Sequence, residues 1–314
     1  MEIPQTVKEL LNEIEGQYPL NQLKTAAANL SADYRERERN GKTFVDSNLV
    51  AAAYLLSRMP ATCGSVDAAL EQTLRRYNKD IKTVLDIGAG TGAVAIAVNK
   101  HLNIDNITLI ERQPEMLKIG KRVTEALGVR AEWKLSDAAS LPNDSYDLVV
   151  TSYMLNELPK EKLEEHISLM WRRTKGLLLI VDNGTPKGFA TLKSVAEILK
   201  RLGGNIVAPC PRVDSCPLDS DDWCHFTARI SRSKIHKELK GGDAPYEDEK
   251  FSYIAVAKEG CAPCNARVLR HPKKEPGKIT LKLCTEKGIQ TKLVTKRDKE
   301  QFKLARRVGA GNEF

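Results

Sequence analysis

Apolar residues near the start of the chain recur at intervals of three and four positions. One set lies within residues 7–14, and a second lies within residues 49–55. This spacing places apolar side chains along one face of a helix. We therefore predict a helical region over residues 1–78.

From residue 79 onward, short β-branched runs alternate with helical patterns. The predicted strands cover residues 83–87, 107–110, 131–135, 148–151, 177–181 and 251–257. The predicted helices between them cover residues 93–99, 114–127 and 160–174. Such alternation is typical of a parallel sheet with helices on both faces, so we expect an α/β domain over residues 79–258.

The alternation of predicted strands and helices is interrupted near the C-terminal end of this domain. Cys and Pro residues interrupt the pattern in the segment 205–226, which we interpret as a Cys-rich insertion. Beyond it, turn residues separate short strands, and a basic helix follows. These elements are expected at residues 267–269, 279–283, 290–294 and 299–308. Residues 259–314 are therefore predicted to form a small β-rich module.

The positive charge of the chain is concentrated in that last segment. The formal net charge is +8, whereas residues 265–314 alone carry 14 Lys and Arg against 5 Asp and Glu, a net of +9. A basic module joined to a nearly neutral body is typical of a protein that binds a polyanion such as RNA. A merely solubilising tail is the alternative. The residues expected to contact phosphates are Lys273, Lys274, Lys278, Lys282, Lys292, Lys296, Arg297, Arg306 and Arg307.

Size and composition predict a folded, two-domain protein outside the membrane. The chain has 314 residues, of which 41% are hydrophobic, and it lacks any run of roughly 20 apolar residues. The acidic, amphipathic N-terminus resembles neither a secretory signal nor a mitochondrial presequence. We expect a cytoplasmic location and a monomer.

A glycine-rich loop is the sharpest motif in the sequence. Asp86, Gly88, Gly90 and Gly92 follow a predicted strand and open a helix, and Glu111 ends the next strand, 19 residues beyond the last glycine. Glycines allow the backbone to turn tightly and approach a ligand. A carboxylate at position 111 could accept hydrogen bonds from ribose hydroxyls. The loop therefore predicts a nucleoside-binding site.

Two acidic residues favour S-adenosylmethionine as the ligand over a dinucleotide. Asp86 precedes the first glycine, where it would crowd a pyrophosphate but suits a cationic amino-acid end. Asp137 follows the third strand, where it could accept from the adenine amino group. The site therefore predicts a Rossmann-like class I methyltransferase domain. A nicotinamide or flavin site and a purely structural turn are the alternatives.

The sequence does not identify a group that would catalyse methyl transfer. The segment 147–158 contains neither an N/D-P-P-Y loop nor a Pro-Cys nucleophile. Asn156 and Glu157 are its polar residues, and either could face the methyl group or serve only as a cap of a local turn. No catalytic residue is therefore predicted.

Six of the seven cysteines lie between positions 210 and 284. Cys210, Cys216 and Cys224 form a C-x5-C-x7-C pattern, with Pro after the first two. Bunched thiols in such a setting favour metal or cluster ligation over disulfides. The spacing is loose for zinc knuckles and fits an iron–sulfur cluster better, but zinc and unligated core thiols remain open. The expected fourth ligand comes from His225, the Cys261/Cys264 pair or Cys284.

Several segments together resemble a known family. The D-x-G-x-G-T-G loop, SYMLNEL, the Cys-Pro pairs, PYEDEKFSYI and the late LKLCT are similar to the methyltransferase-like proteins of small-ribosomal-subunit assembly, known from mitochondria and with bacterial relatives. The resemblance runs from about residue 34 to the basic end. The glycine loop is shared by many methyltransferases, whereas PYEDEKFSYI and the Cys-Pro pairs are specific.

The resemblance implies a function and a ligand set. It implies a [4Fe–4S] cluster held by Cys210, Cys216, Cys224 and Cys284, and association with ribosomal RNA of the maturing small subunit near the messenger channel. Cys261 and Cys264 are extra to the family pattern. We thus expect an S-adenosylmethionine-binding, iron–sulfur-containing factor of ribosome assembly or translation. The alternatives are an active rRNA methyltransferase, a zinc-stabilised RNA-binding protein and a radical enzyme, for which the usual C-x3-C-x2-C spacing is missing.

Overall fold

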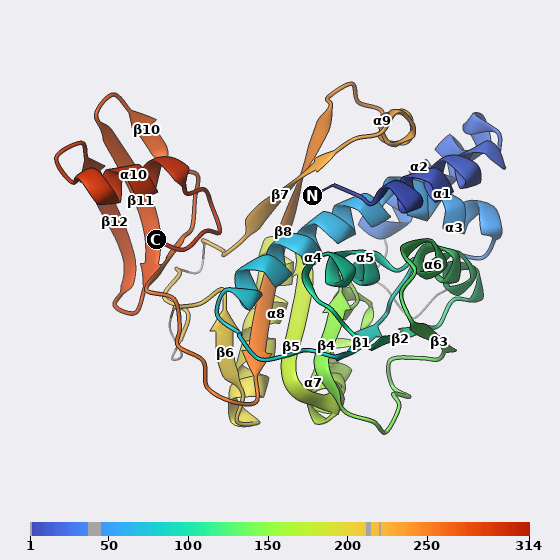
Figure 1. The fold of residues 1–314 in the computed structure, drawn as a ribbon, viewed down its shortest axis with the longest axis horizontal. Helices are drawn as coiled ribbons and strands as arrows, with labels where there is room; N and C mark the ends of the chain where they lie inside the picture. Colours follow the sequence, from blue (N-terminus) through green and yellow to red (C-terminus); the bar gives the residue numbers. More distant parts are fainter. Residues whose placement is uncertain (1, 37–44, 212–214, 220) are drawn as a thin grey trace.

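Four helices at the N-terminus cover one side of the molecule (Figure 1). The computed structural model describes residues 2–36, 45–211, 215–219 and 221–314. The helices are α1 (Gln5–Gly16), α2 (Leu20–Glu36), α3 (Asn48–Ser57) and α4 (Met59–Leu74). The apolar face expected for α1 is buried at Val7, Leu10 and Ile14. Helices α1 and α3 pack against α6 (Pro114–Leu127) of the central domain.

The central domain is built on an eight-stranded sheet. Its strands are β1 (Thr83–Ile87), β2 (Asn106–Glu111), β3 (Ala131–Leu135), β4 (Tyr146–Ser152), β5 (Thr174–Asn183), β6 (Asn205–Ala208), β7 (Phe226–Ser231) and β8 (Tyr246–Ala257). The order is β3-β2-β1-β4-β5-β8-β6, and β7 pairs with the first half of β8. Strands β1 to β5 pair in parallel, whereas β8 runs antiparallel to both β5 and β6.

Apolar side chains alternate between the two faces of this sheet, and each face is covered by helices. Leu177 and Leu179 of β5 join the core under α4 and α5, while Leu178 and Ile180 join the core under α7 and α8. The covering helices are α5 (Ala93–His101), α7 (Leu163–Arg173) and α8 (Pro186–Arg201). Burial on both faces explains why the central strands β1, β2, β4 and β5 contain continuous apolar runs. The α/β prediction is confirmed.

Some elements of this domain escape the sequence pattern. Helix α8 was not predicted, although Thr185 caps it by accepting from the Gly188 N–H and Pro186 occupies its first turn. The predicted helix at 160–174 begins as a 3-10 turn, η2 (Lys160–Lys162), and continues as the shorter α7, and a further 3-10 turn, η1 (Leu155–Glu157), precedes it. Strands β6 and β7 and helix α9 (Lys234–Lys240) were missed because Cys, Pro and Gly residues surround them.

The C-terminal segment forms a second sheet with its own core. It contains β9 (Ala266–Val268), β10 (Lys273–Glu275), β11 (Lys278–Thr285), β12 (Gly288–Thr295) and helix α10 (Lys299–Arg307). Strand β11 pairs with the other three strands, and α10 packs on β11 and β12. We call residues 266–314 the basic lobe. Figure 1 shows it beside the central sheet, on the side of β6.

Within the described residues, no helix is both long enough and apolar enough to cross a bilayer.

Candidate cofactor pocket and cysteine cavity

The glycine loop joins β1 to α5 in a conformation that only glycine adopts readily. Gly88, Gly90 and Gly92 have φ of 75°, 57° and 86°. A Cβ on Gly88 would also come within 2.9 Å of the Met154 side chain. The N–H groups of Gly88 and Ala89 both donate to the Ile110 carbonyl at 2.9 Å, which ties the loop to β2. Backbone hydrogen bonds therefore fix the position of the loop relative to β2.

Glu111, at the end of β2, is bound to the same loop. Its Oε2 accepts from the Gly90 N–H, and its Oε1 accepts from the Gln113 N–H, both at 2.8 Å. Burial raises the pKa of this carboxyl, and the two backbone donors oppose that effect. A carboxylate has further lone pairs available, so Glu111 can still accept from ligand hydroxyls.

A cavity of about 270 Å³ opens in front of the loop. Gly88, Gly90, Glu111 and Asp137 line it, so four of the residues predicted to bind the cofactor lie around one space. Asp137 is exposed at its rim and accepts from the Ala139 N–H at 3.0 Å. We call this space the cofactor pocket.

Asp86 and Gly92 lie in the same loop but do not line the cofactor pocket. Asp86 is fully buried, and neither of its oxygens has a hydrogen-bond partner within the described residues. Burial, together with the nearby Glu111 charge, raises the pKa of Asp86 well above its usual range. A carboxyl in this state is destabilising unless a cation approaches it.

The two polar residues of the segment after β4 also line the cofactor pocket, each with a partner. The Asn156 amide donates to Asp182 Oδ1, and Glu157 Oε2 accepts from Arg112 at 3.1 Å. Their side chains therefore have structural roles in addition to any contact with a ligand.

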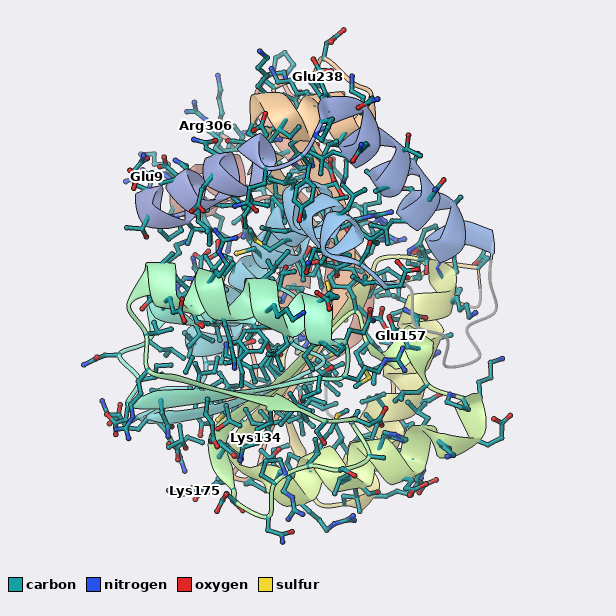
Figure 2. All side chains as sticks on the ribbon, turned by 90° about the vertical axis from the view of Figure 1, so that its right-hand side faces the viewer. Glu9, Lys134, Glu157, Lys175, Glu238 and Arg306 are labelled. Carbon is teal, nitrogen blue, oxygen red and sulfur yellow. The ribbon has the colours of Figure 1, made fainter. Side chains whose placement is uncertain are left out.

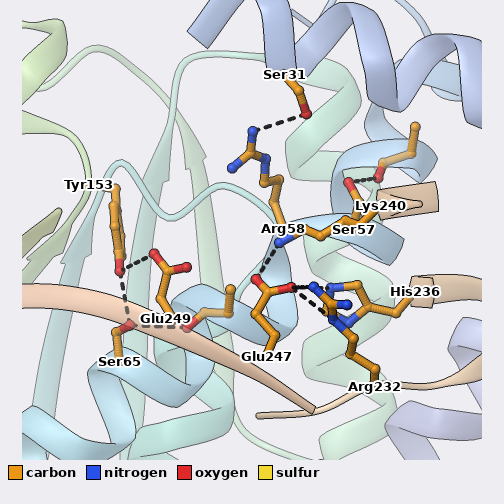
Figure 3. A network of polar contacts seen from close by, with 12 residues as sticks. Ser31, Ser57, Arg58, Ser65, Tyr153, Arg232, His236, Lys240, Glu247 and Glu249 are labelled. Carbon is orange, nitrogen blue, oxygen red and sulfur yellow. Dashed lines mark hydrogen bonds and ion pairs between the residues drawn. The ribbon is translucent and has the colours of Figure 1, made fainter. Parts of the chain in front are cut away.

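Sequence reasoning missed further polar residues of this pocket, among them Tyr153 and Glu249. Tyr153 is the one non-glycine residue with positive φ, 57°, in the described chain. Its hydroxyl lies 3.1 Å from Glu249 Oε1 and 2.9 Å from Ser65 Oγ (Figure 3). The PYEDEKFSYI segment contains Glu249, but only the pairing of β8 with the sheet brings it to the pocket.

The four cysteines predicted as ligands converge on a second cavity. Cys210, Cys216, Cys224 and Cys284 all line one space of about 380 Å³ between β6, β8 and the basic lobe. Cys284 lies on β11, whereas the other three lie in the insertion after β6. We call this space the cysteine cavity. All seven cysteines of the chain are free thiols.

Burial is the main influence on these thiols. It raises the pKa of Cys210 to about 12 and that of Cys224 well above its usual range, and the neighbouring cysteines add to both effects. Among the described residues, no three His, Cys, Asp or Glu side chains are close enough together to hold a metal ion. The iron–sulfur site therefore stays a prediction.

The other candidate ligands lie outside the cysteine cavity. His225 stacks on Trp223, and its Nδ1 lies 3.2 Å from the Trp223 carbonyl. Cys261 is partly exposed, and Cys264 is buried with its Sγ 3.8 Å from the Pro209 carbonyl. Of the alternatives that the sequence left open, Cys284 lines the same cavity as the first three cysteines, while Cys264 lies close enough to Cys210 to raise its pKa.

A buried arginine connects the basic lobe to the central domain. Arg267 of β9 is 1% exposed and lines the cysteine cavity. Its guanidinium donates to the Pro209 carbonyl at 2.8 Å, to Gln72 Oε1 at 2.8 Å and to the Gly311 carbonyl at 2.9 Å. Glu313, which also pairs with Arg76 of the linker after α4, balances its charge at 3.4 Å. The lobe is thus docked by hydrogen bonds independent of any metal.

A second contact joins the lobe to the Cys-rich insertion. Asp222, two residues before Cys224, pairs with Arg270 and accepts from Lys282 at 2.8 Å. Arg270 also donates to the Trp223 carbonyl at 3.0 Å. These pairs lower the pKa of Asp222, whose burial acts in the opposite direction.

Several of the lysines predicted to bind RNA phosphates already make contacts within the protein. Lys282 is engaged with Asp222, Lys274 donates to the Arg306 carbonyl at 2.9 Å, and Lys292 lies over the Phe314 ring. Arg306 and Arg307 are exposed on α10, opposite its buried Ala305. Figure 2 shows many nitrogen-tipped side chains on the surface, including the labelled Arg306.

The topology and the loop together define a class of protein. A sheet of order β3-β2-β1-β4-β5-β8-β6 with an antiparallel β8, and a glycine loop after β1, is the class I Rossmann-like methyltransferase fold. The chain belongs to the family described as "Mitochondrial small ribosomal subunit Rsm22", whose model matches residues 48–314. The family resemblance seen in the sequence is confirmed.

Individual relatives are distant. The Rsm22-cox11 tandem protein 2 of Schizosaccharomyces pombe is 24% identical over 375 residues, which cover 98% of this chain and 48% of that protein. The human ribosome assembly protein METTL17 is 23% identical, over 76% of this chain and 56% of that protein. The chain thus spans about half the length of these relatives.

Solved structures show a similar fold at low identity. Magnesium protoporphyrin IX methyltransferase from Synechocystis PCC 6803, solved with bound S-adenosylmethionine, is 14% identical with a TM-score of 0.44. The alignment covers 73% of this chain and 91% of that one.

Proposed function

We propose that this protein is an S-adenosylmethionine-binding factor that acts on the assembling small ribosomal subunit, carries a [4Fe–4S] cluster and binds ribosomal RNA through its basic lobe. The observation that carries the proposal is the meeting of four cysteines, three from the methyltransferase domain and one from the basic lobe, at one cavity. Family membership supplies the ribosomal context.

The cofactor pocket suits S-adenosylmethionine. Gly88 and Gly90 admit the ligand close to the backbone, Glu111 accepts from the ribose hydroxyls, and Asp137 accepts from the adenine amino group. Asp86, buried without a partner behind the loop, favours the positive charge of the ligand's sulfonium and ammonium groups. A dinucleotide would bring a pyrophosphate toward this carboxyl.

The donor set of the cysteine cavity suits a cluster better than a single zinc ion. A cubane offers a separate iron to each thiolate, so its four ligands need not converge on one point. Cys210, Cys216, Cys224 and Cys284 would hold it, and Arg267 would place a buried positive charge beside an anionic group. The cluster would link the lobe to the domain and add to their existing contacts.

The basic lobe would bind RNA mainly through phosphates. Arg306 and Arg307 on α10, with Lys273, Lys278, Lys296 and Arg297, supply the positive charge. Affinity should fall linearly with the logarithm of salt concentration, with a slope set by the number of phosphates neutralised. Lys282 should contribute less than its position in the sequence suggests, because Asp222 holds it.

The decisive experiment is anaerobic purification with metal analysis. A cluster predicts brown protein with iron and sulfide in equal amounts. Colourless protein with one zinc would support the zinc-stabilised alternative, and metal-free protein would contradict the proposed cofactor. Fractionation on a sucrose gradient tests the partner, since the proposed factor should co-migrate with small-subunit precursors. We further propose that the protein is a cytoplasmic monomer, which imaging and light scattering test.

An active rRNA methyltransferase is the second candidate. The hydrogen-bonded pair Tyr153 and Glu249, which lines the cofactor pocket outside the glycine loop, favours it.

A further inference from the structure

The residues that line the cofactor pocket come from two groups of segments, which we call its two ends. The end described above comes from the glycine loop and the segments after β2 and β3. The other end comes from α3, α4 and the residue between them, the turn after β4, and β5 and β8, and its polar and aromatic lining residues are Tyr54, Arg58, Thr62, Tyr153, Asn183 and Glu249. None of these residues belongs to the glycine motif.

Tyr153 is fixed in this second end by an unusual backbone conformation. Its positive φ of 57° is disfavoured for an aromatic residue. Its N–H donates to the Val181 carbonyl at 2.9 Å, which holds the turn after β4 against β5. Such a backbone conformation persists only where the surrounding structure enforces it, and residues of this kind cluster at functional sites.

The hydroxyl of Tyr153 connects Glu249 to a chain of hydrogen bonds. Tyr153 lies 3.1 Å from Glu249 Oε1 and 2.9 Å from Ser65 Oγ, and Ser65 in turn donates to the Ala61 carbonyl at 3.2 Å (Figure 3). If Glu249 is ionised, the tyrosine donates to it. If Glu249 is protonated, it donates to the tyrosine, which then donates to Ser65. Both protonation states of Glu249 are thus hydrogen-bonded.

The surroundings of Glu249 make it a stronger base than an ordinary carboxylate. Burial raises its pKa, and the negative Glu247 acts in the same direction. Lys240, Arg58 and the Tyr153 hydrogen bond oppose the shift without cancelling it.

We propose that Glu249 and Tyr153 form the methyl-acceptor end of the pocket, and that Glu249 accepts the proton from an N–H of an extruded RNA base during methyl transfer. The proposal rests on the binding of S-adenosylmethionine proposed above. Nucleobases extruded from RNA are recognised by hydrogen bonds to their edges and by stacking on aromatic rings. Glu249 and the Asn183 amide offer the hydrogen-bonding groups, and Tyr54 and Tyr153 offer the rings.

The step balances with the groups named. The lone pair of the base nitrogen attacks the methyl carbon, so a C–N bond forms as the C–S bond of the sulfonium breaks. The donor leaves as the neutral thioether S-adenosylhomocysteine. The proton displaced from the nitrogen passes to the Glu249 carboxylate, and the Tyr153 hydroxyl reorients to accept from the new carboxylic acid. No other reactant is needed.

The experiment uses the full chain, tritiated-methyl S-adenosylmethionine and small-subunit ribosomal RNA extracted from cells in which the gene is deleted. We expect the wild type to label this RNA, and Glu249→Gln to reduce the rate by about 100-fold or more, as for loss of a general base. Asp248→Asn is the matched control, because Asp248 is the neighbouring residue on β8 and pairs on the surface with Arg229. Donor affinity, measured by calorimetry, should stay within about twofold in both variants, since Glu249 is not among the donor-contacting groups.

The variant Tyr153→Phe tests whether the Tyr153 hydroxyl acts on Glu249 or the ring serves only to pack the pocket wall. The tyrosine hydrogen bond lowers the pKa of Glu249, so its loss should move the acidic limb of the pH–rate profile to higher pH. The circular dichroism spectrum should not change.

Three outcomes would overturn the inference: full labelling activity in Glu249→Gln, label in protein instead of RNA, or a wild type that binds the donor and labels no RNA. A wild type that does not bind the donor at all would instead contradict the proposed function itself.

Discussion

The cofactor pocket and the cysteine cavity differ in how the chain builds them. The donor end of the cofactor pocket comes largely from one local motif, in which three glycines and Glu111 lie within 24 residues and are joined by backbone hydrogen bonds. The cysteine cavity draws its four cysteines from segments 60 to 74 residues apart, the insertion after β6 and strand β11 of the second sheet. A local site survives changes elsewhere in the chain, whereas a site at a junction depends on how two domains dock.

The largest expected effect tests that dependence directly. Cys284→Ser should abolish iron and sulfide in anaerobically purified protein, because it removes the ligand supplied by the basic lobe. Cys261→Ser is the matched control, since Cys261 lies outside the cavity, and it should retain full metal content. Equal metal loss in both variants would mean that the extra cysteine pair takes part in ligation.

Arg267→Gln should have the next largest effect, on stability. The substitution removes a buried guanidinium and leaves Glu313, Gln72 and the Pro209 carbonyl with fewer partners. Breaking a buried charged network of this kind typically costs about 3–5 kcal/mol, which urea unfolding of the metal-free protein would measure. Arg229→Gln, which removes an exposed ion pair on β7, should cause little change. Equal stability of the two variants would show that the lobe is docked by other contacts.

Asp86→Asn should separate binding from stability in the cofactor pocket. The carboxyl is buried without a hydrogen-bond partner in the described residues, and its pKa is raised, so its ionised form destabilises the ligand-free protein as the pH rises. The variant should melt at the same or a higher temperature at pH 8, yet bind S-adenosylmethionine about tenfold more weakly, or about 1.4 kcal/mol. Tighter binding would mean that Asp86 does not attract the ligand's positive charge.

The smallest effect lies at the rim of the cofactor pocket. Asp137→Asn should weaken S-adenosylmethionine binding by about threefold, because Asp137 is exposed and contributes one hydrogen bond. Asp144→Asn, a control in the same exposed stretch that does not line the pocket, should bind like the wild type. An effect of equal size in both variants would point to general electrostatics at this edge.

Acid should loosen the hairpin of β7 and β8 before the rest of the fold. Glu247 pairs with Arg232, His236 and Lys240 (Figure 3), and these partners hold its pKa well below the usual range despite burial. The stability that Glu247 contributes is therefore fully present above pH 4.5 and is lost as the pH falls further. Hydrogen exchange should show earlier opening of residues 226–251 on acidification, and Glu247→Gln should remove the pH dependence of that opening.

The sequence was most informative where structure follows local pattern. The parallel strands β1, β2, β4 and β5 contain apolar runs, and the glycine loop needs positive φ at positions where only glycine adopts it freely, so both were predictable. The match of Cys284 to the other three cysteines came from family resemblance, because spacing alone left several candidates open. Tyr153 and Glu249 of the pocket were missed, because no local pattern marks a tyrosine with positive φ or a glutamate brought near by strand pairing.

The net charge of the basic lobe overstates the number of side chains that are available to bind RNA. Lys282 and Cys284 lie two residues apart on β11, and residues at that separation point to the same face of a strand. Lys282 pairs with Asp222, close to Cys224, so part of the positive charge of the lobe is used within the protein.

Under the proposed function, strand β11 would join two binding events in one element. A group in the cysteine cavity would restrain the position of Cys284, and RNA bound to the lobe would restrain the same strand through its other residues. Thermodynamic linkage is reciprocal, so the factor by which the metal group would strengthen RNA binding is also the factor by which RNA would strengthen the binding of that group. The ribosomal precursor would then protect the oxygen-sensitive part of the protein for as long as the two stay together.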